Sequence, residues 1–465
     1  MRDATDKPRG RKRQTHAEDQ TARQNADHRA GLTDANLVAL GDRAFAGLGA
    51  AVLAVSGGAD SMSLMLMAQR WRDVRGRSDF PIHLATVDHG LRAASAAEAE
   101  WVAAQAKALG FETHVLAWPG EKPATAIQAS ARTARYDLLS GLIERLNLPR
   151  PTGLLVGHHL DDQAETFLMR LARGSGIDGL AAMPAERSLA RDPEVVLRRP
   201  LLGLDKATLC VTLTRLGIAW IDDPSNTNAA FERVRVRRAL GVLDDLGVGA
   251  AAIATSSRRL ARACAALAHA TRELAARALD LHAGAYAEID PAAYDAAPED
   301  IRLRLMQHVI ERFGSGGEPV RMIRLEDLVE RLSAGTPAAA TLGGCHVERR
   351  ARAIVATREP GRNGLPVAIL QPGSHLLWDN RFRVACAASH SGAVEVRALT
   401  AAAIKQLNDD SMKNIQARMS IPRSAALTLP AFWQNGRLLA VPHPSVCLIG
   451  DGTLTAEFVT SLSIS

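Results

Sequence analysis

Residues 51–67 read AVLAVSGGADSMSLMLM, in which an apolar run passes into a glycine-containing turn and then into a second apolar run. The first run predicts a buried strand, and the second predicts a helix. Because glycine has no Cβ, Gly57 and Gly58 allow the backbone N–H groups of the turn to approach an anion. The hydroxyl groups of Ser56 and Ser61 add donors at the N-terminus of the helix. The stretch therefore predicts a phosphate-binding turn between a strand and a helix.

Asp60 places a carboxylate in this turn. A carboxylate repels a polyphosphate unless a divalent cation lies between them, so Asp60 is interpreted as a ligand of Mg²⁺, directly or through water. A helix N-cap role is the alternative, and it would explain Asp60 without explaining the glycines and serines around it. The chain contains no Gly-x-x-x-x-Gly-Lys-Ser/Thr pattern, so transfer of a γ-phosphoryl group is not expected.

The Ser-Gly-Gly-x-Asp-Ser pattern resembles the loop of the N-type ATP pyrophosphatases, also called the PP-loop superfamily. This resemblance implies that the chain binds ATP and cleaves it between the α- and β-phosphates, which adenylates an oxygen of the substrate. The residues that it assigns to ATP binding are Ser56, Gly57, Gly58, Ala59, Asp60 and Ser61.

The composition of the chain indicates a globular protein of two to four domains, with 465 residues of which 47% are hydrophobic. No apolar run is long enough to cross a membrane and no secretory signal is evident, so a cytoplasmic location is expected. The five cysteines are scattered without a Cys-x-x-Cys pair, which argues against a disulfide framework or a cysteine metal site. The net charge of +6 suggests a nucleic-acid partner, but residues 1–30 hold eight basic and five acidic side chains and supply half of it.

Strand-like and helix-like patterns alternate along the first half of the chain. Apolar runs at 50–55, 82–87 and 154–156 alternate with helical patterns at 95–109 and 124–146. This alternation predicts an α/β domain with a doubly wound parallel sheet.

The remainder of the chain changes character twice. Residues 247–332 show helical periodicity, with helices expected at 250–281 and 298–313 and no strand-like run between them. After residue 366, short alternating runs are separated by turn signals at 378–380 and 434–436, which predicts a small β-rich domain. The expected organisation is a disordered tail at 1–35, a PP-loop domain at 36–240, a helical domain at 241–360 and a β-rich domain at 361–465.

Ionisable residues gather where the expected strands end. Ligands bind at the carboxyl ends of the strands in a doubly wound sheet, and Ser56, Asp88-His89 and Gly157-His158-His159 all fall there. Asp161 and Glu165 follow at a spacing that puts both on one helix face. Helix capping would explain these carboxylates but not two adjacent histidines. Their spacing matches no standard transition-metal site, so Mg²⁺ brought by ATP is preferred to a dedicated metal.

The order of several motifs resembles that of the tRNA(Ile)-lysidine synthetases. The matching segments are Ser56 to Ser61, Asp88 to Arg92, Ala131 to Tyr136, Gly157 to Thr166, Arg170 to Gly176, Arg199 to Leu202 and Trp220 to Asn226, with looser matches at 429–430 and 438–442. One departure is Val234, which stands where the family usually has asparagine in an Arg-Asn-x-x-Arg-like run.

This resemblance implies that ATP adenylates the wobble cytidine of an isoleucine tRNA with a CAU anticodon at its C2 oxygen, and that lysine then displaces AMP. The product, lysidine, changes the codon read from AUG to AUA. The implied catalytic residues are Asp60, with Mg²⁺, Arg132 for phosphate charge and Glu165 for the lysine amine. The implied lysine or cytidine pocket comprises Asp88, His89, Arg92, His158, His159, Asp161 and Asp162, and the implied tRNA contacts are Arg233, Arg235 and Arg237.

Three other classes of protein share parts of this pattern. A tRNA thiolase of the same loop class would rely on paired cysteines, and the sequence places no cysteine beside the expected crevice. A small-molecule amide-forming ligase would carry a nitrogen-supplying domain, which residues 241–465 do not resemble. A tRNA-binding protein without catalysis is the third class. A homodimer is compatible with the sequence, which does not determine the oligomeric state.

Overall fold

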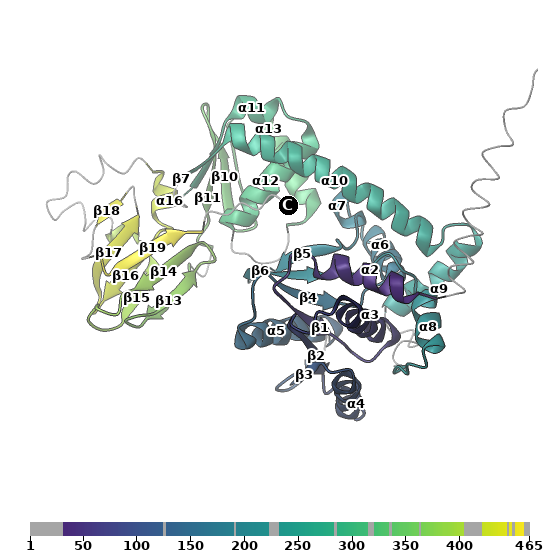
Figure 1. The fold of residues 1–465 in the computed structure, drawn as a ribbon. Helices are drawn as coiled ribbons and strands as arrows, with labels where there is room; N and C mark the ends of the chain where they lie inside the picture. Colours follow the sequence, from purple (N-terminus) through teal and green to yellow (C-terminus); the bar gives the residue numbers. More distant parts are fainter. Residues whose placement is uncertain are drawn as a thin grey trace, which may run out of the picture. The chain divides into compact units, whose positions relative to one another are not determined.

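The computed structural model describes residues 31–123, 127–189, 192–222, 232–282, 286–314, 320–333, 337–361, 364–403, 421–443, 446–448 and 452–459. The chain forms two compact units, Met1–Cys264 (unit 1) and Ala265–Ser465 (unit 2) (Figure 1). The predicted tail at 1–35 lies outside the described residues except for its last five. The boundaries predicted at 240 and 360 remain predictions, and each unit is described by itself.

Unit 1 is built on a six-stranded sheet in the order β3-β2-β1-β4-β6-β5. The strands are β1 (Ala50–Ala54), β2 (Ile82–Asp88), β3 (Glu112–Ala117), β4 (Thr152–Val156), β5 (Glu186–Leu189) and β6 (Asp192–Arg198). All neighbours pair in parallel except β5, which pairs antiparallel with β6 at the edge. The predicted parallel sheet is therefore confirmed, with one antiparallel edge strand added.

Helices cover both faces of this sheet (Figure 1). Alternate residues of β1 enter different cores: Leu53 packs in the core that includes helix α3, whereas Val52 packs in the core that includes helix α5. The side-chain period of two explains this, since successive residues of a strand point to opposite faces. The helices of unit 1 are α2 (Asp34–Phe45), α3 (Ala59–Arg75), α4 (Ser95–Ala108), α5 (Ile127–Leu146), α6 (Leu160–Leu171), α7 (Ile177–Leu180), α8 (Lys206–Arg215), α9 (Glu232–Asp245) and the first part of α10 (Ala250–Ala278).

Unit 2 begins with helices and a five-stranded antiparallel sheet in the order β7-β8-β11-β10-β9. The strands are β7 (Leu279–His282), β8 (Tyr286–Ile289), β9 (Ala338–Leu342), β10 (Cys345–Arg349) and β11 (Ile354–Arg358), and the helices are α11 (Pro291–Asp295), α12 (Glu299–Phe313) and α13 (Met322–Ser333). The helices expected near 250–281 and 298–313 are present. The expectation of no strand before 332 is wrong, because β7 and β8 lie there.

The last part of unit 2 is β-rich, as the sequence predicted. One sheet has the order β12-β15-β16-β17-β18 and another the order β13-β14-β19. The strands are β12 (Ala368–Leu370), β13 (His375–Trp378), β14 (Phe382–Cys386), β15 (Val394–Ala398), β16 (Pro430–Gln434), β17 (Arg437–His443), β18 (Val446–Leu448) and β19 (Leu454–Phe458), with helix α16 at Arg423–Ala426.

Both turn signals of the β-rich part are hairpin turns. Asp379 and Asn380 have φ angles of 48° and 54°, and Asn435 and Gly436 have φ angles of 50° and 77°. Two consecutive residues with positive φ match the right-handed twist of the flanking strands, and Asn, Asp and Gly adopt this conformation most easily.

No single helix of the described residues has the length and apolar character needed to cross a membrane. The pair α9 and α10 meets that criterion only when both helices are counted together, and they meet at a bend of 100°.

Candidate active site at the carboxyl ends of the parallel strands

The turn between β1 and α3 is held in shape by Ser61. Its Oγ accepts a hydrogen bond from Ser56 N at 3.1 Å and donates one to Gly58 O at 3.0 Å. Gly57 has a φ of +89°, and a Cβ there would lie 2.7 Å from Ile221 Cδ1, so only glycine fits. A Cβ at Gly58 would meet no atom within 4 Å, which leaves the start of α3 open on that side. The turn has the open backbone that an anion requires.

Asp60, in the first turn of α3, faces the neighbouring strand end. Its Oδ2 lies 3.4 Å from His159 Nε2 and 4.0 Å from Lys206 Nζ. Burial raises the pKa of Asp60, but the hydrogen bond with His159 and the charges of His159 and Lys206 outweigh burial and lower it below its usual value. Oδ1 is buried and has no hydrogen-bond partner among the described residues. Asp60 therefore presents an ionised oxygen with unused acceptor capacity.

His159 stands at the end of β4 among three carboxylates. Its Nδ1 lies 3.1 Å from Asp161 Oδ2, and its Nε2 lies 3.4 Å from Asp60 Oδ2 and 3.6 Å from Asp162 Oδ2. Burial alone would lower the pKa of His159, but hydrogen bonds to Asp161 and Asp60 and the charge of Asp162 raise it to about 10. His159 is therefore an imidazolium that connects the start of α3 to the start of α6.

His158, the preceding residue, is neutral near pH 7, whereas His159 is positively charged. Arg199 Nε donates to His158 Nδ1 at 3.2 Å. Burial lowers the pKa of His158 to about 4, assisted by the charges of Arg199, Arg132 and Arg135 against the opposing charge of Asp162. Adjacent histidines thus divide the site into an acidic side around His159 and a basic side around His158.

The basic side consists of arginines from α5 and from the end of β6. Arg135 is half-buried and its Nη2 lies 3.5 Å from Ala54 O, at the end of β1. Arg132, one turn earlier on α5, is exposed, and its guanidinium lies 5.4 Å from the ring centroid of Tyr136. Arg199 is 4% exposed and donates to Pro184 O at 2.7 Å. The sequence singled out Arg132, whereas Arg135 is the arginine that reaches the strand carrying the turn.

Glu165 is fully buried and paired with α9. Arg237 Nε donates to Glu165 Oε1 at 2.7 Å, and Arg233 Nε lies 3.5 Å from Glu165 Oε2. Arg233 Nη2 also lies 3.7 Å from Asp162 Oδ1. Arg233 and Arg237 are one helical turn apart, so both lie on the face of α9 that meets α6. These two arginines contact the acidic residues of the site, and the tRNA contact expected for them from the sequence stays a prediction.

Positions 234 and 235 of α9 are not part of that face. Arg235 is exposed, whereas Val234 is 7% exposed. The side chain at the position where the sequence departs from the family pattern is therefore packed inward.

Asp88, His89 and Arg92 follow β2 but are used differently. Asp88 Oδ1 accepts from Gly90 N at 2.8 Å and from Ser95 Oγ at 2.6 Å, and these bonds lower the pKa of Asp88. Arg92 Nη2 donates to Glu98 Oε2 at 2.8 Å. Both side chains thus shape the connection to α4. His89 Nδ1 is buried without a hydrogen-bond partner among the described residues, which leaves it available to a ligand.

Sequence reasoning missed Lys206 and Arg199 as site residues. Lys206 is the first residue of α8, its backbone N–H donates to Asp161 Oδ2 at 2.9 Å, and its ammonium faces Asp60. Arg199 directly follows β6, and that position at a strand end was a usable signal. Lys206 gave no such signal, because a loop separates it from β6.

Cys210 is the cysteine of unit 1 that follows Lys206 on α8, one helical turn later. Its side chain is partly buried and packs against the core that includes α3. Burial raises the pKa of Cys210, so the thiol stays protonated at neutral pH and is a poor nucleophile. A single protonated cysteine does not supply the paired chemistry of the thiolase alternative.

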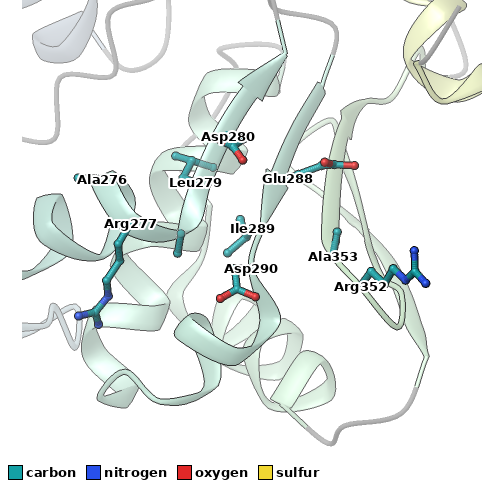
Figure 2. A pocket seen from close by; sticks show the side chains of 10 residues that line it. Ala276, Arg277, Leu279, Asp280, Glu288, Ile289, Asp290, Arg352 and Ala353 are labelled. Carbon is teal, nitrogen blue, oxygen red and sulfur yellow. The ribbon is translucent and has the colours of Figure 1, made fainter.

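Unit 2 has a separate hollow of about 180 Å³. Figure 2 shows charged side chains from the end of α10, from β7 and β8 and from the turn before β11 around it. The charged residues that line it are Arg277, Asp280, Glu288, Asp290 and Arg352. None of the residues predicted from the sequence as catalytic or binding lies in this hollow.

Comparison with known proteins agrees with the arrangement in unit 1. The family described as PP-loop domain matches residues 36–243. Among solved structures, the U34-tRNA thiolase NcsA from Methanococcus maripaludis matches 48% of this chain and 78% of its own, with a TM-score of 0.39 and 17% identity. That similarity is too low to bear on function.

Curated relatives match over most of their length. A tRNA(Ile)-lysidine synthase of Bradyrhizobium sp. (strain BTAi1) is 45% identical over 64% of this chain and 84% of the relative. The enzyme of the same name from Ruegeria pomeroyi is 36% identical over 84% of this chain and 87% of the relative. The enzyme of this name from Rhodopseudomonas palustris is 40% identical over 68% of this chain and 92% of the relative. With the PP-loop domain in place and this extent of identity, the chain belongs to the tRNA(Ile)-lysidine synthase family.

Proposed function

We propose that the chain ligates lysine to C2 of the wobble cytidine of an isoleucine tRNA with a CAU anticodon, at the expense of ATP. In the first step, the C2 oxygen attacks the α-phosphate of ATP and pyrophosphate leaves. In the second, the lysine amine attacks C2, the C2–O bond breaks and AMP leaves. The observation that carries the proposal is the contact between Asp60 of the phosphate-binding turn and His159 of the acidic cluster, which joins two chemistries in one site.

The adenylation step falls to the turn and to the basic side of the site. The N–H groups at the start of α3 and the open backbone at Gly58 receive phosphate oxygens. Arg135 and Arg132 approach from α5 and neutralise negative charge that develops on the phosphates. Asp60 fits Mg²⁺, since its buried Oδ1 has no other partner, and Mg²⁺ bound there would offset phosphate charge.

The ligation step falls to the acidic side. A free lysine amine is protonated at neutral pH and must lose a proton before it can attack. Asp161 keeps 35% of its side chain exposed and Asp162 keeps 13%, so these two carboxylates are the groups that an incoming ammonium can reach. Glu165 is fully buried behind them. We therefore assign Glu165 a positioning role, through Arg233 and Arg237, in place of the direct contact with lysine that the sequence suggested.

Contact with tRNA is proposed for exposed arginines of α9 and α10. Arg235 is exposed on α9, and Arg258, Arg259 and Arg262 are exposed on the part of α10 that belongs to unit 1. Phosphate contacts by such side chains supply most of the affinity for nucleic acid and make it salt-dependent.

We also propose a cytoplasmic location, where ATP and tRNA occur together, and a homodimer. Light scattering of the purified chain tests the homodimer.

A pyrophosphate-release assay tests the order of the steps. The chain is incubated with ATP and Mg²⁺, without lysine, in the presence of the isoleucine tRNA or of a methionine tRNA that shares the CAU anticodon. The proposal predicts release of pyrophosphate and AMP bound to tRNA only with the isoleucine tRNA. Release that requires no tRNA would favour a small-molecule ligase, and no release at all would favour a binding protein.

A further inference from the structure

A cluster of two histidines and a glutamate lies on strands β2 and β3, outside the site described above. His83 is the second residue of β2, and Glu112 and His114 are two residues apart on β3. In the parallel register, His83 pairs with Glu112. Residues two apart on a strand share a face, so all three side chains stand on the same face of the sheet.

The nitrogen and oxygen atoms of this cluster converge on one point. His83 Nδ1 lies 3.2 Å from His114 Nε2 and 3.5 Å from Glu112 Oε2, and His114 Nε2 lies 3.8 Å from Glu112 Oε1. Two ligands about 2.0–2.1 Å from a tetrahedral metal ion are about 3.3 Å apart. The first two separations are close to this spacing, whereas the third, which joins His114 to the other carboxylate oxygen, is longer. Every ligand is of a type that Zn²⁺ accepts.

We propose that His83, Glu112 and His114 bind a divalent transition metal, with Zn²⁺ as the best fit, and that this ion ties β3 to β2. Two imidazoles and one carboxylate supply three ligands, and a water completes a tetrahedral ion. Glu112 is 65% exposed, so the fourth position is open to solvent.

The surroundings favour a metal held by imidazole nitrogen. Two of the three donors are imidazole nitrogens from His83 and His114, and only Glu112 supplies oxygen. A hard ion such as Mg²⁺ or Ca²⁺, which prefers oxygen ligands, would find one carboxylate here. Imidazole ligands suit Zn²⁺, Cu²⁺ and Ni²⁺.

This site is separate from the one proposed for ATP. His83 and Asp88 lie near opposite ends of β2, five residues apart, which corresponds to about 16 Å along a strand. Its binding can thus be measured without reference to catalysis.

The experiment is calorimetric titration of the untagged, chelator-treated full chain with Zn²⁺, followed by the visible absorption spectrum of the Co²⁺ form. The expected result of the titration is that Zn²⁺ binds to the wild type and that its binding depends on this cluster. The Co²⁺ form should show the intense visible absorption bands of a tetrahedral site. His114→Ala and Glu112→Gln should each weaken binding at least about tenfold, consistent with the loss of one ligand. His269→Ala, on α10 beside Glu273, is the matched control and should bind as the wild type does.

Because His83 is buried and His114 is partly buried, their replacement could disturb the fold, and Glu112→Gln at an exposed position avoids this difficulty. The proposal is overturned if the wild type binds no Zn²⁺ at micromolar concentrations. It is equally overturned if Glu112→Gln and His114→Ala both bind as tightly as the wild type, because the ion would then lie elsewhere.

Discussion

At the scale of single residues, the charge of His159 makes a pH-dependent contribution to stability. Its pKa in the folded chain is about 10, above the value of about 6.5 for a free imidazole. A raised pKa stabilises the fold fully below pH 6.5, and the stabilisation is lost as the pH rises towards 10. His159→Gln should therefore lower the free energy of unfolding most near pH 6.5, and progressively less towards pH 10, as measured by urea denaturation.

His158→Gln is the matched control for this pH dependence. The pKa of His158 is lowered to about 4, so its ring is neutral over the whole range from pH 6.5 to 10. Its replacement should change stability by an amount that does not vary over that range. A His159→Gln effect that is constant or grows with pH would show that the imidazolium does not hold the carboxylates together.

Asp60 is the residue on which adenylation should depend most. Asp60→Asn keeps the size of the side chain but removes the charge that would face Mg²⁺, and should slow tRNA-dependent pyrophosphate release by at least about 100-fold. Asp73→Asn, on the same helix but in its last turn, is the control and should leave the rate unchanged. Equal rates in the wild type and Asp60→Asn would remove Asp60 from the reaction.

The pair of Glu165 and Arg237 tests the positioning role. Glu165→Gln and Arg237→Gln should each slow the ligation step, and the double variant should be little worse than either single variant. We expect a coupling energy of about 1–3 kcal/mol, because Arg237 donates a short hydrogen bond to the buried carboxylate of Glu165. Additive effects, obtained from single-turnover rates of all four proteins, would mean that Glu165 acts without Arg237.

At the scale of elements, the turn before α3 separates a structural glycine from a functional one. Gly57→Ala should destabilise the fold by about 1–3 kcal/mol, because φ is positive there and a Cβ would meet Ile221. Gly58→Ala should leave the melting temperature nearly unchanged, since nothing surrounds that position, but raise the KM for ATP. Similar effects of both variants on stability and KM would contradict this distinction.

Sequence patterns predicted the elements whose partners are close in the chain or whose signals are local. The parallel sheet follows from apolar runs separated by helices, and the hairpin turns follow from Asp379-Asn380 and Asn435-Gly436. Strands β7 and β8 were missed because each has only four residues and β8 pairs with the distant β11. Their pairing depends on tertiary contacts that no local pattern records.

The candidate site was predictable in part for a similar reason. Residues at the junction between a strand and the next helix, such as Asp60 after β1 and His159 after β4, could be brought together from topology alone. The pairing of Arg233 and Arg237 with Glu165 could not, since the packing of α9 on α6 is not encoded in the spacing of either helix. From the sequence alone, which does not show this packing, arginines on a helix are interpreted as a solvated basic face.

At the scale of the whole molecule, each unit has its own sheets and its own buried core. The groups proposed for ATP and lysine all belong to unit 1. Unit 2 contributes none of them, so its proposed role is in holding tRNA. This division predicts that substrate choice, and not only binding, depends on the full chain.

The measurement that tests the central claim most directly is transfer of radiolabelled lysine to tRNA. The full chain is incubated with ATP, Mg²⁺, labelled lysine and either the isoleucine tRNA with a CAU anticodon or the methionine tRNA, and the tRNA is digested to nucleosides. We predict label in a modified cytidine from the isoleucine tRNA and none from the methionine tRNA. ATP consumption with no label in any cytidine would contradict the account.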